Sequence, residues 1–301
     1  MGDAIGLETH DPQSPAEWHD HITRYGYVIV HNVLPKEDLQ ATVDDIWRHT
    51  GASPDDPESW YRPDVIRIGG MVEMYQYQSM WNNRQNQRLY DVFRAVHGTD
   101  KLWVSIDRVG LKPPVNPAHP EYDHRGMIHW DTDMTRYPDI PFGVQGVLAL
   151  TDTEPDMGGF QCIPETYQNL EKFLATQTRE NIESRRPDYT GYTITKPRLA
   201  AGDLLIWTTL LLHGNGHNVS DKPRLCQYIS MNPAPEAGGV RNTRMEDTDA
   251  ERQGRIECWR KNTHPAYRAF PGDPRAIEEE RTEPAELTDL GKRLLGVDPW
   301  S

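Results

Sequence analysis

Cysteine is scarce in this 301-residue chain, and its three thiols, Cys162, Cys226 and Cys258, stand far apart without a CxxC pair. An odd number of scattered cysteines predicts neither a disulfide framework nor a cysteine-ligated zinc site. No apolar run approaches the roughly 20 residues that a membrane-spanning helix needs. The opening "MGDAIGLETHDPQSPAEW" also lacks the basic start and apolar stretch of a secretory signal. We therefore expect a cytoplasmic protein with no membrane partner.

Basic side chains are outnumbered as well. The chain carries 32 Lys and Arg against 46 Asp and Glu, a formal net charge of -14 at pH 7. A nucleic-acid-binding surface needs clustered Lys and Arg, so we expect no nucleic-acid partner. A small-molecule substrate remains open, because a basic pocket can lie inside an acidic shell. The sequence also lacks internal repeats and low-complexity linkers, and we expect one domain over residues 1–301.

Helix signals gather toward the two ends of the chain. Ser14 to Glu17 has the pattern of a capping box with proline at the first helical position, which predicts a helix to about Arg24. One-sided apolar spacing ended by glycine predicts three more helices, in "PKEDLQATVDDIWRHTG", from about Leu89 to Gly98, and in "LTDLGKRLLG". Residues 52–66 are rich in proline and acid and predict a loop.

From about residue 102, short apolar runs alternate with turns that contain Gly and Pro. This texture is typical of strands in a sandwich or jelly roll. We expect a mainly β core over about residues 100–235, wrapped by helices from both ends and interrupted once by helical residues 164–177. The strands expected in this core are "LWVSIDRVGL", "FGVQGVLALTD", "GGFQCIP", "GYTITKP", "DLLIWTTLLLHG" and "RLCQYISMNP". A β-branched strand is also expected before the core, in "YGYVIVHNVL".

His129 and Asp131 form a His-x-Asp motif in "GMIHWDTD". A non-haem Fe(II) oxygenase holds its metal with two His and one carboxylate, and an extended segment can supply two of these ligands on one side. His119 and Glu121 have a comparable spacing, and a lone pair of this kind is more often two surface polar residues. We favour His129 and Asp131 because apolar neighbours flank them, whereas His119 lies in a proline-broken loop.

The remaining histidine ligand must come from a later strand. The run "DLLIWTTLLLHG" delivers His213 at its end, whereas His217 lies inside the following turn and ranks lower. Arg224 opens the next strand eleven residues after His213. Its planar guanidinium can bind the far carboxylate of a dicarboxylate bidentately. Each residue alone also fits a structural role, but the combination favours a metal site with an anionic co-substrate.

Across these motifs the sequence resembles the phytanoyl-CoA dioxygenase family of Fe(II)- and 2-oxoglutarate-dependent oxygenases. The most specific block is the last, where His213, Asn218 and Arg224 fall at the family's spacing. The similarity covers most of residues 25–232 and is carried by "YGYVIVHNVLPKEDL", "LKPP", "HWDTD", "VLALTDTEPDMGGFQCIP" and "AGDLLIWTTLLLHGNGHNVSDKPR".

The resemblance implies a double-stranded β-helix in which His129, Asp131 and His213 hold iron and Arg224 grips the far carboxylate of 2-oxoglutarate. It also implies a co-substrate contact from Asn215, two residues after the distal histidine. Fe(II), 2-oxoglutarate and O2 are then required, and hydroxylation of a small organic molecule releases succinate and CO2. The carboxylate of Asp131 favours hydroxylation over halogenation, because related halogenases have a small residue there that admits chloride. Desaturation and ring chemistry stay open as alternatives.

Two stretches depart from the family's usual pattern. "PETY" at residues 164–167 stands where the family commonly has Pro-Gly-Ser-His, and the segment between "LKPP" and His129 is long. Both can line the substrate entrance, so the founding member's acyl-CoA substrate is a weak guide. Candidates for substrate contact are the aromatic residues Trp130, Tyr137 and Phe142 and the arginines Arg67 and Arg136. An arginine in the pocket would favour an anionic or zwitterionic substrate.

Two other functions use the same features. A zinc or manganese cupin-like hydrolase or isomerase would use the same ligands but has no need of Arg224. A non-catalytic jelly-roll binding protein would tolerate simultaneous replacement of His129 and Asp131. The sequence does not indicate an oligomeric state.

Overall fold

The computed structural model describes residues 14–67, 69–241, 247–265 and 283–301. Its centre is a six-stranded antiparallel sheet in the order β1-β7-β5-β9-β4-β2. Two smaller antiparallel ladders pair β10 with β3 and β6 with β8. The strands are β1 (Tyr27–Val30), β2 (Met71–Val72), β3 (Leu102–Val104), β4 (Val109–Lys112), β5 (Val144–Ala149), β6 (Phe160–Cys162), β7 (Leu204–Thr208), β8 (His213–Asn215), β9 (Arg224–Tyr228) and β10 (Met231–Pro233).

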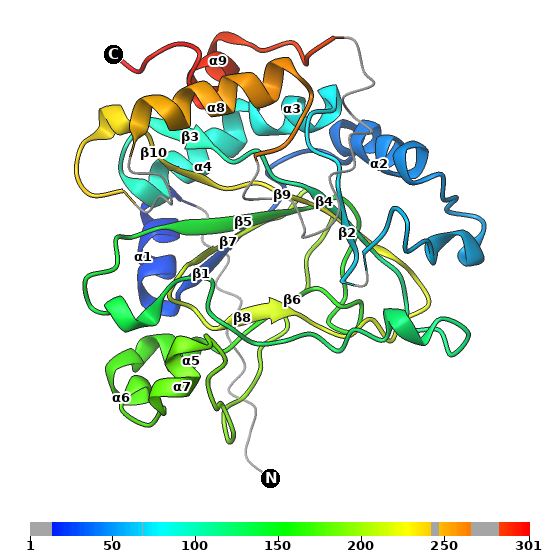
Figure 1. Ribbon diagram of the computed structural model, residues 1–301, viewed down its shortest axis with the longest axis horizontal. Coiled ribbons are helices and arrows are strands. Elements are labelled where there is room, and N and C mark those ends of the chain that lie inside the picture. The colour runs from blue at the N-terminus through cyan, green and yellow to red at the C-terminus, as the bar shows by residue number, and fades with distance from the viewer. Residues whose placement is uncertain (1–13, 68, 242–246, 266–282) are drawn as a thin grey trace.

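Helices and the β6-β8 ladder lie on opposite sides of the large sheet (Figure 1). The helices on the first side are α2 (Lys36–Thr50), α3 (Gln78–Arg84), α4 (Gln87–His97), α8 (Thr248–Arg260) and α9 (Asp289–Leu295). Beyond the ladder lie α5 (Pro164–Gln168), α6 (Leu170–Leu174) and α7 (Arg179–Glu183). α1 (Pro15–Tyr25) packs against α4 and β1. Short 3-10 turns cover Pro57–Trp60, Pro120–Tyr122, Met134–Arg136 and Pro235–Ala237.

The two faces of the large sheet bury different apolar clusters. Side chains alternate along a strand, so neighbouring residues of β7 face opposite ways. Leu204 and Ile206 join the larger cluster beneath the helices. Leu205 and Trp207 join a smaller cluster that includes Phe160 of the β6-β8 ladder. The space between the large sheet and this ladder is where the candidate site lies.

The predicted helices are confirmed where the structure describes them. Ser14 accepts from the Glu17 backbone and Glu17 accepts from that of Ser14, so the capping box at the start of α1 is complete. α2 and α4 end at Gly51 and Gly98, each in the left-handed conformation that glycine adopts easily. α9 begins after Thr288, whose side chain accepts from Gly291, and stops at Gly296. The helical stretch expected at 164–177 is present as α5 and α6.

Three predicted strands are broken because the chain changes sheet inside them. Residues 102–111 divide into β3, which pairs with β10, and β4, which pairs with β9. Residues 203–214 divide into β7 in the large sheet and β8 in the ladder, and residues 224–233 divide into β9 and β10. The residues before and after each break are buried and apolar alike. The hydrophobic pattern therefore does not show where the chain passes from one sheet to the other.

Two further expectations were wrong in detail. "GYTITKP" is not a strand: it contributes only the bridge of Thr195 to Cys162. The β core is also not confined to residues 100–235, because β1 and β2 come from the N-terminal part and complete the large sheet. α3 and α8 were not predicted as separate elements, since both are polar, and across the described residues helix outweighs strand.

None of the helices in the described parts of the chain is long and apolar enough to cross a membrane. Cys162 and Cys226 are buried free thiols, and Cys258 is a half-buried one. Burial raises the pKa of the Cys162 thiol well above its usual range, so this residue of β6 stays a protonated, unreactive thiol.

A substitution in β7 tests how much the large sheet contributes to stability. Ile206 is fully buried and lies opposite Val28 of β1 and Gly146 of β5. We expect Ile206→Ala to lower the free energy of unfolding by about 3 kcal/mol and Ile206→Val by about 1 kcal/mol, because the cavity left behind differs in size. Urea denaturation with an unchanged m-value measures both. Equal losses in the two variants would contradict this packing.

Candidate metal centre

The candidate centre is formed where the segment before β5 meets the start of β8. His129 and His213 form an isolated antiparallel bridge, in which the His129 amide donates to the His213 carbonyl at 2.9 Å and the reverse bond is 3.2 Å. The extended segment expected around His129 therefore pairs with β8 at a single bridge. That bridge nevertheless places the histidine of the His-x-Asp motif beside the distal histidine.

Glycine makes this close approach possible. A Cβ atom at Gly214 would lie 1.9 Å from the carbonyl oxygen of Met127, and one at Gly126 would lie 1.9 Å from that of Asn215. Side chains at either position would force the two segments apart. Gly214, which follows His213 in "LLLHGNG", is therefore required by the close packing of these two segments at the site.

Three side chains converge at the bridge. One potential ligand atom from each of His129, Asp131 and His213 lies within 4.8 Å of the others. His129 Nε2 is 3.1 Å from Asp131 Oδ1, and His213 Nε2 is 3.4 Å from Asp131 Oδ2. His213 is buried, and the other two are half-buried. The sequence-based choice of these three residues as one cluster agrees with the geometry.

Each imidazole is oriented by a carbonyl behind it. His129 Nδ1 lies 3.1 Å from the Met127 carbonyl, and His213 Nδ1 lies 2.9 Å from the Leu211 carbonyl. We assign the proton to Nδ1 in both rings because a carbonyl can only accept. This leaves two Nε2 lone pairs and one carboxylate facing a common point, which is a donor set that suits a divalent transition metal.

Electrostatics keep the carboxylate ionised. Burial alone would raise the pKa of Asp131, but hydrogen bonds and charge from His129 and His213 outweigh it and hold that pKa far below its usual range. Burial likewise works against a charged His129, yet the Asp131 carboxylate raises the pKa of that imidazole. Gln145 Nε2 donates to Asp131 Oδ2 at 2.7 Å, and Arg185 donates to the Asp131 backbone carbonyl at 3.1 Å.

Arg224 occupies the buried start of β9 and is 3% exposed. Its Nε is buried without a hydrogen-bond partner among the described residues, and its Nη2 lies 3.5 Å from the Tyr228 hydroxyl. The Asn215 amide donates to the same hydroxyl at 3.2 Å. Arg224 and Asn215, both predicted from the sequence, are therefore linked through Tyr228, which was missed. The period-2 alternation of β9 would have found Tyr228, because it shares a face with Arg224.

The rival candidates lie elsewhere. His119 stacks on Tyr61 with ring centroids 4.5 Å apart, and its Nε2 is 3.1 Å from Glu58. His217 pairs with Asp123 at 2.5 Å. Neither histidine belongs to the cluster at His213.

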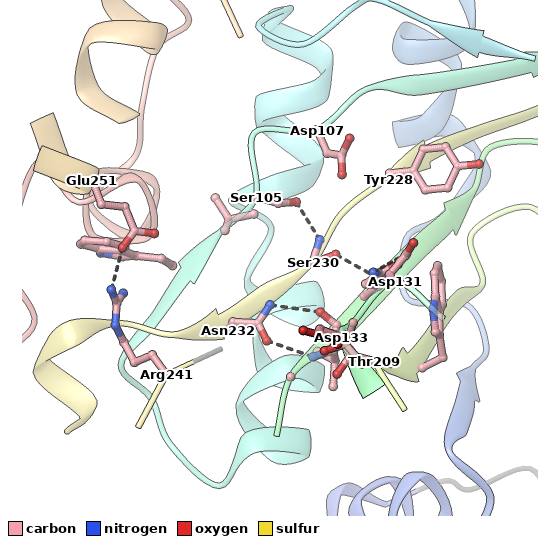
Figure 2. A pocket seen from close by; sticks show the side chains of 18 of the residues that line it. Ser105, Asp107, Asp131, Asp133, Thr209, Tyr228, Ser230, Asn232, Arg241 and Glu251 are labelled. Atoms are coloured by element: carbon pink, nitrogen blue, oxygen red, sulfur yellow. Dashed lines mark hydrogen bonds and ion pairs between the residues drawn. The ribbon is translucent and has the colours of Figure 1, made fainter. Parts of the chain in front are cut away.

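A cavity of about 580 Å³ opens from Asp131 (Figure 2). Polar side chains dominate its wall, and the Arg241–Glu251 ion pair lies on the side away from Asp131 (Figure 2). Of the predicted substrate contacts, Arg136 lines the cavity and Arg67 does not. Trp130 is core, with its indole donating to the Leu210 carbonyl at 3.0 Å. The residues that line the cavity but were not foreseen include Trp103, Asp107, Thr132, Asp133, Gln145, Arg185, Trp207, Thr209, Asn232 and Arg255.

Two histidines and one carboxylate brought together at an antiparallel bridge, with a buried arginine on a neighbouring strand, are the arrangement of a non-haem iron oxygenase that uses a dicarboxylate co-substrate. A model of the family described as Phytanoyl-CoA dioxygenase (PhyH) matches residues 22–226, and the chain belongs to this family. Fe(II) and 2-oxoglutarate are the metal and co-substrate of this enzyme class. The chemistry of the donor set and the orphaned Arg224 Nε fit both.

The chain is also similar to individual proteins. "Ava biosynthesis cluster protein O" of Aspergillus versicolor is 26% identical over 245 residues, covering 72% of this chain and 77% of that protein. The epimerase SnoN, solved with Fe3+, alpha ketoglutarate and nogalamycin RO, has a TM-score of 0.55 at 17% identity and covers 91% of this chain and 95% of its own. A putative oxidoreductase from Salmonella typhimurium LT2 has a TM-score of 0.65 at 15% identity, with coverages of 94% and 82%. At these identities the solved structures show a shared fold.

Substitution of Gly214 tests the close approach at the centre. We expect Gly214→Ala to weaken Zn(II) or Co(II) binding at least about tenfold, because the new methyl group displaces the segment that carries His129. Gly254→Ala in α8 is the matched control, since no atom lies within 4 Å of its added Cβ. Calorimetric metal titration of folded protein measures both. Unaltered metal affinity in Gly214→Ala would contradict the geometry.

Proposed function

We propose that the protein is an Fe(II)- and 2-oxoglutarate-dependent dioxygenase that hydroxylates an unactivated carbon of a small organic metabolite, with succinate and CO2 as co-products. The observation that carries the proposal is the cluster of His129, Asp131 and His213 together with the buried guanidinium of Arg224, whose Nε has no hydrogen-bond partner among the described residues. We further propose that the whole chain forms one oxygenase domain. In it, the six-stranded sheet and the β6-β8 ladder correspond to the two layers of a double-stranded β-helix.

Each residue has a defined role in this proposal. His129 and His213 would bind Fe(II) through Nε2, each held in orientation by the carbonyl at its Nδ1. Asp131 would bind through one oxygen while Gln145 donates to the other. Arg224 would receive the far carboxylate of 2-oxoglutarate, with Asn215 and Tyr228 beside it. Burial raises the pKa of Tyr228 to about 12, so its phenol stays protonated and able to donate.

The bound iron and co-substrate together supply the oxidising power for C–H attack, and the protein supplies position and exclusion of water. The cavity beside Asp131 is where a substrate carbon would sit. Trp207 shields the metal end, since its ring lies 5.1 Å from that of His213 and also lines the cavity. The carboxylate of Asp131 would occupy the ligand position that chloride takes in related halogenases, which favours hydroxylation over halogenation.

A hydrolase or isomerase that uses the same ligands is supported less well. Such an enzyme has no need of a guanidinium 3% exposed beside the metal site, whereas a dicarboxylate co-substrate does. The epimerase SnoN has the same fold, so oxidative outcomes other than hydroxylation belong to the test. Product analysis separates them: hydroxylation adds one oxygen to the substrate, and epimerisation leaves its composition unchanged.

The co-substrate role of Arg224 is tested by anaerobic addition of Fe(II) and 2-oxoglutarate. A metal-to-ligand charge-transfer band is expected with the wild type, and it should vanish in Arg224→Ala at modest 2-oxoglutarate concentration. Arg198→Ala is the control, because Arg198 is an exposed arginine paired with Glu154 at 2.6 Å. An undiminished band in Arg224→Ala would reject the assignment.

The polar cavity wall predicts the kind of substrate. Arg136 lines the cavity, is exposed and has no ion-pair partner within the described ranges, which favours a metabolite with an anionic group. Polar carboxylated metabolites should stimulate succinate release more than their methyl esters do. Arg136→Gln should raise the KM for the carboxylated metabolites about tenfold or less, because it removes one exposed ion pair. Preference for the ester would contradict this expectation.

A further inference from the structure

Two buried cations stand opposite each other in the large sheet. Lys112, the last residue of β4, is 2% exposed and pairs in register with Arg224 of β9, which is 3% exposed. Directly opposed residues of an antiparallel pair share a face, and like charges there destabilise the sheet. The shared face is that of Cys226, which packs in the cluster toward the β6-β8 ladder. Both cations thus belong to the side that carries the candidate centre.

The partners of both cations are uncharged. Lys112 Nζ donates to the carbonyl of His124 at 3.3 Å and to the carbonyl of Gly216. Arg224 has only the Tyr228 hydroxyl within reach of Nη2 in the described structure. None of the carboxylates in the described ranges forms an ion pair with either cation. An ammonium carries three N–H donors, so one donor of Lys112 remains available after the two carbonyls are served.

The positions of these carbonyls matter. His124 lies in the segment that leads to His129, and Gly216 directly follows β8, which carries His213. Lys112 therefore joins the two segments that bear the metal donors. Its stem also packs where only glycine fits: a Cβ at Gly158, which has a φ of +70°, would lie 2.9 Å from Lys112 Cε.

Arg224 packs on the same turn. A Cβ at Gly159 would lie 3.9 Å from Arg224 Cδ. The Gly158–Gly159 turn therefore lies next to the side chains of both cations. Burying two like charges without an anion destabilises the fold, and such an arrangement is tolerated where a ligand supplies the opposite charge.

We propose that Lys112 is a second cationic contact for the co-substrate, with its remaining N–H directed to the far carboxylate that Arg224 holds. This inference rests on the proposed function, because it assumes that a dicarboxylate enters this space. Lys112 would then do two things at once: it ties together the segments of His129 and His213, and it contributes to the charge that selects a dianion. A lysine that only clasps the two carbonyls is the competing explanation.

The two explanations differ in their pH dependence. Burial, and then the nearby charge of Arg224, lower the pKa of Lys112 to about 7 in the absence of an anion. A bound carboxylate raises that pKa again, so binding above about pH 7 requires proton uptake and weakens by up to about tenfold per pH unit. Of the other groups nearby, Arg224 stays charged, and burial lowers the pKa of His124, so that it stays neutral. His217 and Asp123 form a separate pair.

The test is calorimetric titration of 2-oxoglutarate into the Zn(II)-loaded protein, from about pH 6.5 to about pH 9, in two buffers of different ionisation enthalpy. The wild type should take up close to one proton per 2-oxoglutarate near pH 8.5 and lose affinity as the pH rises. Lys112→Met should bind about tenfold or more weakly at pH 6.5 and show neither proton uptake nor the pH slope. His217→Gln, as the matched control, should keep the wild-type slope.

Each outcome decides the matter. The proposal is overturned if Zn(II)-loaded Lys112→Met binds 2-oxoglutarate with the affinity and the pH dependence of the wild type. Lys112 would then only hold the two backbone carbonyls together. If Lys112→Met does not fold, the absence of proton uptake by the wild type is sufficient to overturn it. A Zn(II)-loaded wild type that binds no 2-oxoglutarate at any pH would overturn the proposed function as well, which separates the two failures.

Discussion

The backbone bridge between His129 and His213 is the constraint on which the candidate centre depends. Two segments about eighty residues apart in the chain exchange hydrogen bonds at this single point. Gly126 and Gly214 allow the approach because a side chain at either would collide with a carbonyl of the opposite segment. Once the bridge forms, the rotation of each imidazole is set by a carbonyl behind it, and Asp131 lies between the rings. Ligand geometry is thus specified by backbone contacts before any metal binds.

The net charge of the whole chain and the charge buried near the metal donors have opposite signs. The chain as a whole carries a net charge of -14, yet the space next to the metal donors contains the buried cations Lys112 and Arg224. An acidic exterior and a cationic interior are compatible, because the buried groups are little screened while the surface charges are solvated. The same contrast explains why the net charge, from which we expected no nucleic-acid partner, gave no information about a small anionic ligand.

Much of the site could be predicted from the sequence. The spacing of His129 and Asp131, and the position of His213 at the end of a continuous apolar run, correctly identified three residues that the fold brings together. Arg224 and Asn215 were also placed near one another, although their link through Tyr228 was not foreseen. Gln145 could not be found, because a glutamine inside an apolar strand carries no signal until the strand's neighbour across space is known. The polar cavity wall was missed for the same reason.

Helix ends that depend on adjacent residues could be predicted from the sequence. The points where the chain passes from one sheet to another could not. The capping box at Ser14 and the glycine stops of the helices depend on adjacent residues, and they were located correctly. The break between β7 and β8 depends on which sheet each half joins, and "DLLIWTTLLLHG" is apolar throughout. The break matters for function, because it carries His213 out of the large sheet to the ladder where His129 can meet it.

The most direct measurement of the central claim is a crystal structure of the protein with Mn(II), in place of Fe(II), and 2-oxoglutarate under anaerobic conditions. The account predicts one metal ion bound by His129 Nε2, one oxygen of Asp131 and His213 Nε2, with the far carboxylate of 2-oxoglutarate on Arg224. A metal held instead by His119 or His217, or a co-substrate bound away from Arg224, would contradict it.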